Sequence, residues 1–420
     1  MKEKSGVNVA KLRKGRSVMI TRRTFVQSGA AAAALTISAG SARADNAPGV
    51  TDSEIKIGQT MPYSGPASAY GVIGRTETAY FKMINDQGGV NGRKINLISL
   101  DDAYSPPKTV EQVRRLVEDE KVAFLFNTLG TAPNTAIRQY CNDSKVPQLF
   151  VATGAAKWDD PKHFPWTMGY NPNYQTEASI YAKQILASKP DAKIAVLFQN
   201  DDFGKDYLIG LKEGLGAEKA GMIVKEASYE TSEPTVDSQV VTLQGSGADV
   251  FLIAATPKFA AQAIRKSYDL GWNAVRYITN VSVSIATILK PAGLDKSKGL
   301  ITGGYVLDVT DKRYKDDPNV KAWSDFTSKY MSASQFADAN AAYAYGAAAT
   351  MIQVLKQCGN DLSRENVMKE AANLKKFAVP LFDPGITAST SPDNFSPVRQ
   401  LQPLTFNGTS WEPFGAIVQG

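Results

Sequence analysis

Two apolar runs, each ending in a loop of small and hydroxyl-bearing residues, constrain this chain most. The first run, Val122 to Phe126, breaks into NTLGT, and the second, Gln148 to Ala152, breaks into TGA. A segment of helical periodicity joins them, so the stretch predicts a β-loop-α-β-loop unit. In an open parallel sheet both loops leave the carboxyl ends of their strands and meet in one crevice. Their hydroxyl and N–H groups suit an anion, although each loop can equally be a plain turn between core strands.

The N-terminus has the pattern of an export signal. The chain has 420 residues, and Arg22 and Arg23 precede an Ala-rich stretch at 28–40 and an A-x-A site that ends at Ala44. This apolar stretch is shorter than the ~20 residues that span a bilayer. We therefore expect a signal peptide of the twin-arginine type over residues 1–44, cleaved after Ala44, with either Met1 or Met19 as its start.

Composition excludes some classes of partner once the leader is removed. The formal charge of +6 depends on residues 1–44, which hold nine Lys/Arg and one Glu, so 38 basic and 40 acidic residues remain. A net charge near −2 does not imply nucleic-acid binding. Export permits a disulfide, but Cys141 and Cys358 lie in separate helix-periodic segments, and we favour two free thiols.

Strand and helix signals alternate through the rest of the chain, which indicates an α/β fold. The first such half runs to the Asn171-Pro172 break, and a second half continues to about Thr279. After Gly303-Gly304, long helical patterns follow without strands between them, and we expect these helices to cover the first sheet. The sequence closes with two strand patterns of hairpin type, 400–406 and 411–418.

Six sequence blocks resemble the leucine/isoleucine/valine-binding family of periplasmic solute-binding proteins. They occur in the family's order within residues 53–418. The blocks are IKIGQTMPYSGPASAYG, MINDQGGVNGRKINL, DDAYSPPKTVE, VPQLFVATGAA, IAVLFQNDDFGKD and ADVFLIAATPKFAAQAIRKSYDLGW. The resemblance implies a type I periplasmic binding protein, in which two doubly wound α/β lobes are joined by three hinge crossings and hold a ligand between them.

The same resemblance implies a domain plan and partners. Lobe 1 is expected at 45–171 plus 305–385, and lobe 2 at 172–304 plus 392–420. The crossings are then near Asn171, Gly303 to Tyr305, and Pro384 to Pro392. The family's role implies a periplasmic monomer that binds a small molecule and delivers it to the permease subunits of an ABC transporter in the inner membrane, with no cofactor.

Ligand contacts are carried over from the family onto matching positions. These are Tyr63, Ser64, Tyr70, Thr131, Ala152, Thr153, Gly154, Phe203, Thr256, Asn280 and Ser282. The chain departs from the family pattern at Gly154, where Ser or Thr is common, and near Ser282, where an acidic residue usually meets the ligand's ammonium group.

These departures bear on the ligand. The segment Asn280 to Ser284 holds no carboxylate, and burying an ammonium group without a counter-charge costs several kcal/mol. We therefore favour an aromatic or branched-chain carboxylic acid. Branched-chain or other amino acids, or an amide, are the alternative, because Asp201, Asp202 or Asp338 could supply the missing charge.

An exported enzyme on a similar scaffold is the competing hypothesis. His163 is the only histidine, and the chain has no G-x-S-x-G elbow, Walker A run or G-x-G-x-x-G after a strand. No metal site is expected, because the acidic pairs Asp101-Asp102, Asp201-Asp202 and Asp316-Asp317 have no His or Cys partners. We interpret Tyr343 and Tyr345 as residues that pack a helix. A second aromatic cluster can line either the cleft or the core, and it consists of Trp158, Trp166, Tyr170 and Tyr174.

Overall fold

The computed structural model describes residues 46–419. The expected leader, both candidate start residues and the cleavage site after Ala44 lie outside these described residues. Within them, no helix combines the length and the apolar character that crossing a membrane requires. Cys141 and Cys358 are both buried and unpaired, as expected.

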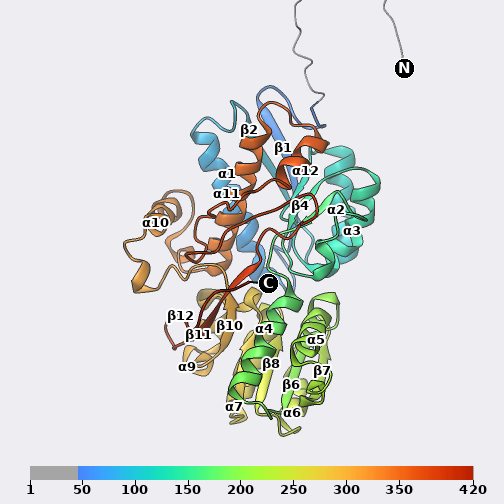
Figure 1. Cartoon of the computed structure of the whole chain (residues 1–420). Coiled ribbons are helices and arrows are strands. Elements are labelled where there is room, and N and C mark those ends of the chain that lie inside the picture. The colour runs from blue at the N-terminus through green and yellow to red at the C-terminus, as the bar shows by residue number, and fades with distance from the viewer. Residues whose placement is uncertain (1–45, 420) are drawn as a thin grey trace, which may run out of the picture. The chain divides into compact units, whose positions relative to one another are not determined.

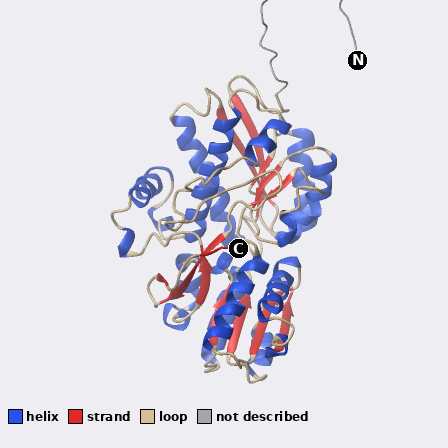
Figure 2. Cartoon of the chain, viewed as in Figure 1, coloured by secondary structure: helices blue, strands red, loops and turns tan. Residues whose placement is uncertain are grey.

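Helices and strands alternate along most of the described chain (Figures 1 and 2). The strands are β1 (Glu54–Met61), β2 (Lys94–Asp101), β3 (Leu125–Phe126), β4 (Gln148–Val151), β5 (Thr167–Gly169), β6 (Ile194–Gln199), β7 (Ile223–Tyr229), β8 (Val250–Ala254), β9 (Val275–Ile278), β10 (Ile301–Gly304), β11 (Gln400–Phe406), β12 (Trp411–Pro413) and β13 (Val418–Gln419). The helices are α1 (Val72–Asp86), α2 (Pro106–Arg114), α3 (Thr131–Asp143), α4 (Tyr174–Ser188), α5 (Asp202–Leu215), α6 (Asp237–Gln244), α7 (Pro257–Asp269), α8 (Lys290–Ala292), α9 (Leu294–Ser297), α10 (Pro318–Tyr330), α11 (Ala339–Cys358) and α12 (Arg364–Ala371).

The first sheet is parallel and has the strand order β2-β1-β3-β4-β5. Successive side chains of a strand point to opposite faces, and the strands β3 and β4 are buried on both of them, whereas the edge strand β2 leaves Lys94, Asn96 and Asp101 exposed. Leu125 packs with residues of α2 and α3, whereas its neighbour Phe126 packs with residues of α1 and α11. The sheet is therefore doubly wound, and its β3 and β4 loops leave at the same edge.

The second sheet has the order β12-β11-β10-β9-β8-β6-β7, and β13 also pairs with β11. Strands β6 to β10 run parallel, and the C-terminal strands join antiparallel. Val196 and Leu252 face the helices α4 and α5, whereas Leu197 and Phe251 face α6 and α7. The fold class expected from the sequence, two α/β lobes, is confirmed.

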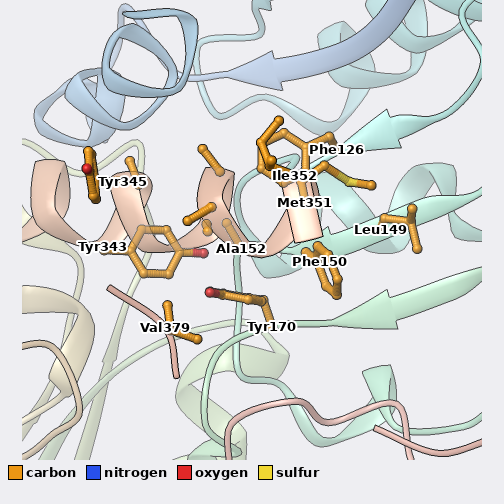
Figure 3. Packing of buried hydrophobic residues seen from close by; sticks show 14 of the residues in the cluster. Phe126, Leu149, Phe150, Ala152, Tyr170, Tyr343, Tyr345, Met351, Ile352 and Val379 are labelled. Carbon is orange, nitrogen blue, oxygen red and sulfur yellow. The ribbon is translucent and has the colours of Figure 1, made fainter. Parts of the chain in front are cut away.

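The long helix α11 covers the first sheet. Its buried Met351 and Ile352 lie beside Phe126 and Phe150 of that sheet (Figure 3). The helix is rich in alanine and buries most of its circumference, which lets it pack closely against α1 and the strands. The expectation that the strandless helices cover the first sheet therefore holds for α11.

Three segments of chain pass between the sheets. The first follows β5, the second follows β10, and the third precedes β11. Before the third crossing, the Phe395 N–H still donates to Asp159 Oδ1 beside the first sheet (2.6 Å). The lobe boundaries given above remain a prediction.

Candidate ligand-binding site

A cavity of about 90 Å³ lies at the carboxyl ends of both parallel sheets. Its wall combines the loops after β3, β4, β6, β8 and β9, the crossing at 304–309, the start of α11, and Leu404 and Trp411 from the C-terminal strands. An engineered cavity of roughly 150 Å³ holds one benzene molecule. In this conformation the cavity therefore suits a small solute, and a larger one requires the lobes to part.

Seven of the eleven expected ligand contacts line this cavity. They are Tyr70, Thr131, Ala152, Thr153, Phe203, Thr256 and Asn280. They come from loops that follow different strands, and the parallel topology brings those loop ends together.

The other four expected contacts are not among the lining residues. Tyr63 Oη bonds Ser99 Oγ (2.6 Å), and the Ser64 hydroxyl donates to Asp101 Oδ2 (2.5 Å). Ser282 is fully buried and its hydroxyl donates to the Ala255 carbonyl (2.7 Å). These three side chains are therefore used inside their own lobes.

Gly154 is the fourth, and its departure from the family pattern has a steric reason. A Cβ atom at this position would lie 2.0 Å from the Pro172 carbonyl oxygen and 2.8 Å from the Tyr174 ring. The first crossing runs directly against this glycine, and the Tyr174 N–H donates to the Gly154 carbonyl (2.8 Å). Ser or Thr does not fit here without moving the crossing.

One end of the cavity can receive an anion without any cationic side chain. Thr131 is the first residue of α3, and its hydroxyl bonds the Thr153 hydroxyl (2.6 Å). No side chain caps this helix. Pro133 has no N–H, and the Asn134 N–H donates to the Gly130 carbonyl (3.1 Å), so the N–H groups of the first two residues of α3 are the ones left without a capping side chain. Free N–H groups at a helix N-terminus together with the helix dipole favour negative charge.

Tyrosines form much of the remaining wall, and sequence analysis missed most of them. Tyr104 lies in a two-residue left-handed turn with Ala103 (φ 60° and 52°), and this unusual backbone carries its ring into the cavity. Tyr305 comes from the second crossing, and Tyr343 lies on α11. No strand-end pattern marks such positions, because they depend on a strained turn and on distant segments.

Tyr343 has a double role that the helix-packing interpretation covered only in part. Its hydroxyl accepts a hydrogen bond from Asn127 Nδ2 (2.9 Å) and its ring packs on Tyr170 (Figure 3). The same side chain lines the cavity, whereas Tyr345 packs against Tyr80 in the core. Trp158 is 2 % exposed and does not line the cavity, which assigns it to the core.

Asp308 is the only Asp, Glu, Lys, Arg or His among the residues that line the cavity. Its Oδ1 accepts from the Thr310 hydroxyl (2.6 Å), and its Oδ2 accepts from the Trp411 N–H (3.0 Å). The carboxylate thus ties the second crossing to the C-terminal strand. Sequence analysis did not single out this residue.

The other carboxylates considered for an ammonium group are not in the wall. Asp201 caps α5 by accepting from the Gly204 N–H (3.3 Å), and burial raises its pKa to about 6. Asp338 caps α11 and accepts from the Ser284 hydroxyl (2.8 Å). Lys157 holds Asp202 in an ion pair (2.6 Å).

Glu177 lies fully buried behind Asn280. It accepts hydrogen bonds from the Asn280 backbone N–H (2.9 Å) and side-chain amide, and from the hydroxyls of Tyr181 and Tyr207. Burial raises the pKa of Glu177 to about 8, although the hydrogen bonds oppose this rise. In the described part of the chain, no group of three or more His, Cys, Asp or Glu side chains is placed to hold a metal ion.

Comparison with known proteins identifies the family to which this two-lobed architecture belongs. A family model described as "Periplasmic binding protein" matches residues 54–404. The chain belongs to the periplasmic binding proteins. The resemblance that six sequence blocks indicated is confirmed, and the family implies a location in the periplasm.

Relatives and solved structures agree with this assignment. The chain is 25% identical to Leu/Ile/Val-binding protein homolog 1 of Brucella suis over 367 residues, which cover 84% of this chain and 90% of that protein. A branched-chain amino acid ABC transporter structure from Thermus thermophilus with bound valine has a TM-score of 0.78 at 16% identity, covering 88% of this chain and 98% of that one. A solute-binding protein of Rhodopseudomonas palustris in complex with 3,4-dihydroxybenzoic acid has a TM-score of 0.72 at 17% identity, covering 87% and 97%.

Proposed function

We propose that this periplasmic binding protein binds a small carboxylic acid, aromatic or branched-chain, and delivers it to the permease subunits of an ABC importer. The observation that carries the proposal is the anion-binding end of the cavity at Thr131, Thr153 and the N-terminus of α3. Neutral donors of this kind hold a carboxylate through charge-assisted hydrogen bonds. The role is that of a monomeric receptor, not of an enzyme.

The apolar and aromatic wall supports the second part of the ligand. Tyr70, Tyr104, Tyr174, Phe203 and Trp411 line the cavity. Ring contacts contribute about 0.5–1.5 kcal/mol beyond the area they bury. Two structural neighbours of this fold hold valine, which is an amino acid, and 3,4-dihydroxybenzoic acid, which has no amino group, so the aromatic acid is the neighbour's ligand that matches this proposal.

An amino acid is the second candidate, and Asp308 is the observation that favours it. A carboxylate in the wall can pair with an ammonium group. However, protein donors already occupy both of its oxygens, and no second acid lines the cavity. We therefore keep a carboxylic acid without an amino group as the main proposal.

Calorimetry of matched pairs tests this choice with the purified mature chain. The pairs are leucine against 4-methylpentanoate, and phenylalanine against 3-phenylpropionate. We expect the acid without the amino group to bind more tightly in at least one pair. Tighter binding of the amino member in both pairs contradicts the proposal and assigns Asp308 as the partner of an ammonium group.

A further inference from the structure

A buried hydrogen bond beside the cavity joins the two α/β halves of the molecule. The Ser284 hydroxyl donates to Asp338 Oδ1 (2.8 Å), and the two residues are 1 % and 3 % exposed. Ser284 lies in the loop after β9 of the second sheet, whereas Asp338 caps α11, the helix that covers the first sheet. Because the cavity also lies between these halves, the bond is part of the closed conformation.

The residues next to this bond form part of the cavity wall. Both chain neighbours of Ser284 and both chain neighbours of Asp338 line the cavity. These four residues are Val283, Ile285, Ala337 and Ala339. Their side chains are apolar, unlike the hydroxyl groups at the Thr131 end. The bond therefore fastens a seam in an apolar part of the wall, and the seam can open only when the bond breaks.

Each partner in the bond is held in place by its own half of the molecule. Asp338 Oδ1 also accepts from the Asn340 N–H (3.0 Å), as the cap of α11. Ser284 Oγ accepts from the Thr287 hydroxyl (2.8 Å), so the single Ser284 proton is left for Asp338. Two groups that are already oriented lose little conformational freedom when they meet, which raises the net gain from the bond.

Another polar contact between the halves is far more exposed. Lys157, which follows β4, forms an ion pair with Asp202 of α5 (2.6 Å), and their side chains are 28 % and 51 % exposed. Exposed ion pairs contribute little and are screened by salt. A buried carboxylate that loses a donor is penalised more strongly, because no water replaces that donor while the wall stays closed. Ser284 and Asp338 are therefore the pair better suited to hold the halves together.

We propose that Ser284 and Asp338 are positioning residues that hold the apolar wall against the bound ligand, and that they set how slowly the ligand dissociates. The inference rests on the proposed function in that it needs a solute in this cavity, whether or not the solute carries an amino group. Contacts present with and without ligand, such as the α11 cap, cancel from the affinity, whereas a bond that forms on closure contributes to it. This bond acts after the ligand has entered, so its effect is on dissociation rather than on association.

Calorimetry and stopped-flow tryptophan fluorescence on the purified mature chain test the role of Ser284, since Trp411 lines the cavity. The probe is the tightest-binding of leucine, phenylalanine, 4-methylpentanoate and 3-phenylpropionate. We expect Ser284→Ala to raise the dissociation rate constant about tenfold or more, with the association rate constant within about threefold. Thr287→Val is the matched control, because it removes a bond to Ser284 Oγ but leaves the bond to Asp338. This control and Asp202→Asn should each keep both rate constants within about threefold.

Two changes at Asp338 distinguish a bond between the halves from local structure. Asp338→Ala removes the acceptor and should speed dissociation as Ser284→Ala does, and the double variant should be no faster than the faster single variant. Asp338→Asn keeps an oxygen that can accept from Ser284 and cap α11, so it should restore slow dissociation. The restoration should hold for leucine and for 4-methylpentanoate alike.

The outcomes separate this inference from the proposed function. Binding of amino acids alone overturns the proposed ligand class, and the role of Ser284 is then measured with leucine or phenylalanine. Additive effects of the two Ala substitutions, or equally fast dissociation from Thr287→Val, overturn this inference and leave the proposed function standing. An Asp338→Asn variant that loses affinity only for the amino acids also overturns it, because the carboxylate then serves an ammonium group. Failure of all four solutes to bind overturns both proposals.

Discussion

The hydroxyls of Thr131 and Thr153 bond each other, so at least one of their two protons is free to meet a ligand. Thr131→Val keeps the shape of the side chain and removes one donor. We expect it to weaken carboxylate binding by about 1.5–3 kcal/mol, the range for a hydrogen bond to a charged group. Calorimetry with the tightest acid of the pairs above measures the loss.

Thr135→Val is the control for this change. Thr135 lies one turn further along α3, and its hydroxyl donates to the Thr131 carbonyl (2.8 Å) instead of lining the cavity. Its replacement should leave affinity within a few tenths of a kcal/mol, as for surface substitutions. If both variants bind as the unmodified chain does, the anchor for the carboxylate is elsewhere.

Residues that follow the ends of strands could be predicted from the sequence, and others could not. Thr131, Thr153 and Asn280 come directly after apolar runs, and parallel topology alone places them at one edge. Asp308 and Trp411 reach the cavity from a crossing and from the last strands, which are distant in sequence. Asp308 and Trp411 reach the cavity wall only because the antiparallel strands add to the edge of the second sheet. Local sequence patterns do not predict this long-range pairing.

At the scale of elements, the turn between β3 and α3 depends on Gly130. Its φ is +100°, and a Cβ atom there would lie 2.5 Å from the Tyr104 ring. Gly130→Ala should cost about 1–3 kcal/mol in the free energy of unfolding, from backbone strain and from displacement of Tyr104. Urea denaturation measures it, and ligand affinity should fall as well because both residues line the cavity.

Gly216→Ala separates strain from crowding. Gly216 also has a left-handed backbone (φ +75°), but nothing lies within 4 Å of an added Cβ atom. We expect a loss of about 1 kcal/mol from strain alone and no change in affinity. Equal losses in both variants would show that contact with Tyr104 contributes little.

Most elements were recognisable because apolar runs and helical periodicity mark them. The exceptions are short. Val122 to Phe126 was expected as one strand, but β3 spans only Leu125–Phe126, although the Ala123 N–H also donates to the Lys56 carbonyl of β1 (2.8 Å). Strand β5 was missed because three residues carry no detectable period. The final strand expected at 411–418 is divided into β12 and β13, which both pair with β11.

At the scale of the whole molecule, buried acids make stability depend on pH. Burial raises the pKa of Glu177 to about 8, and the pKa values of Asp201 and Asp383 to about 6. The folded chain thus binds these protons more tightly than the unfolded chain. Their stabilisation is present below about pH 4 and is lost as pH rises through 6 and 8.

We therefore expect a lower urea midpoint at about pH 8.5 than at about pH 5, at constant ionic strength. Some acids have a lowered pKa, such as Asp311 beside Arg313. Their effect on stability changes only at pH values near or below the ordinary pKa of an aspartate, so it does not mask the decrease expected between pH 5 and pH 8.5. Glu177→Gln should make the decrease shallower. A midpoint that rises across this interval would contradict the assignment of these acids.

Closure of the lobes is the second prediction at this scale. The Tyr70 hydroxyl donates to the Val281 carbonyl (3.0 Å), which joins a loop beside the first sheet to one beside the second. We expect ligand to favour such closed contacts by a hinge motion, with a smaller radius of gyration in solution scattering. Ligand at 100 times its dissociation constant should add about 2.7 kcal/mol of stability. Identical scattering profiles with and without saturating ligand would argue against the motion.

The antiparallel pairing of β10 with β11 has a consequence for the order of events during synthesis. Ile301 pairs with Thr405, so the second sheet gains its neighbour for β10 only when the last part of the chain is available. Contacts between residues so far apart in sequence form late, because the chain loses the entropy of closing a long loop before these contacts can stabilise it. A nascent or truncated chain that ends before Gln400 exposes β10 as an open edge, which invites pairing with other chains. We therefore expect a chain that lacks the final twenty or so residues to aggregate more readily during folding than the full chain.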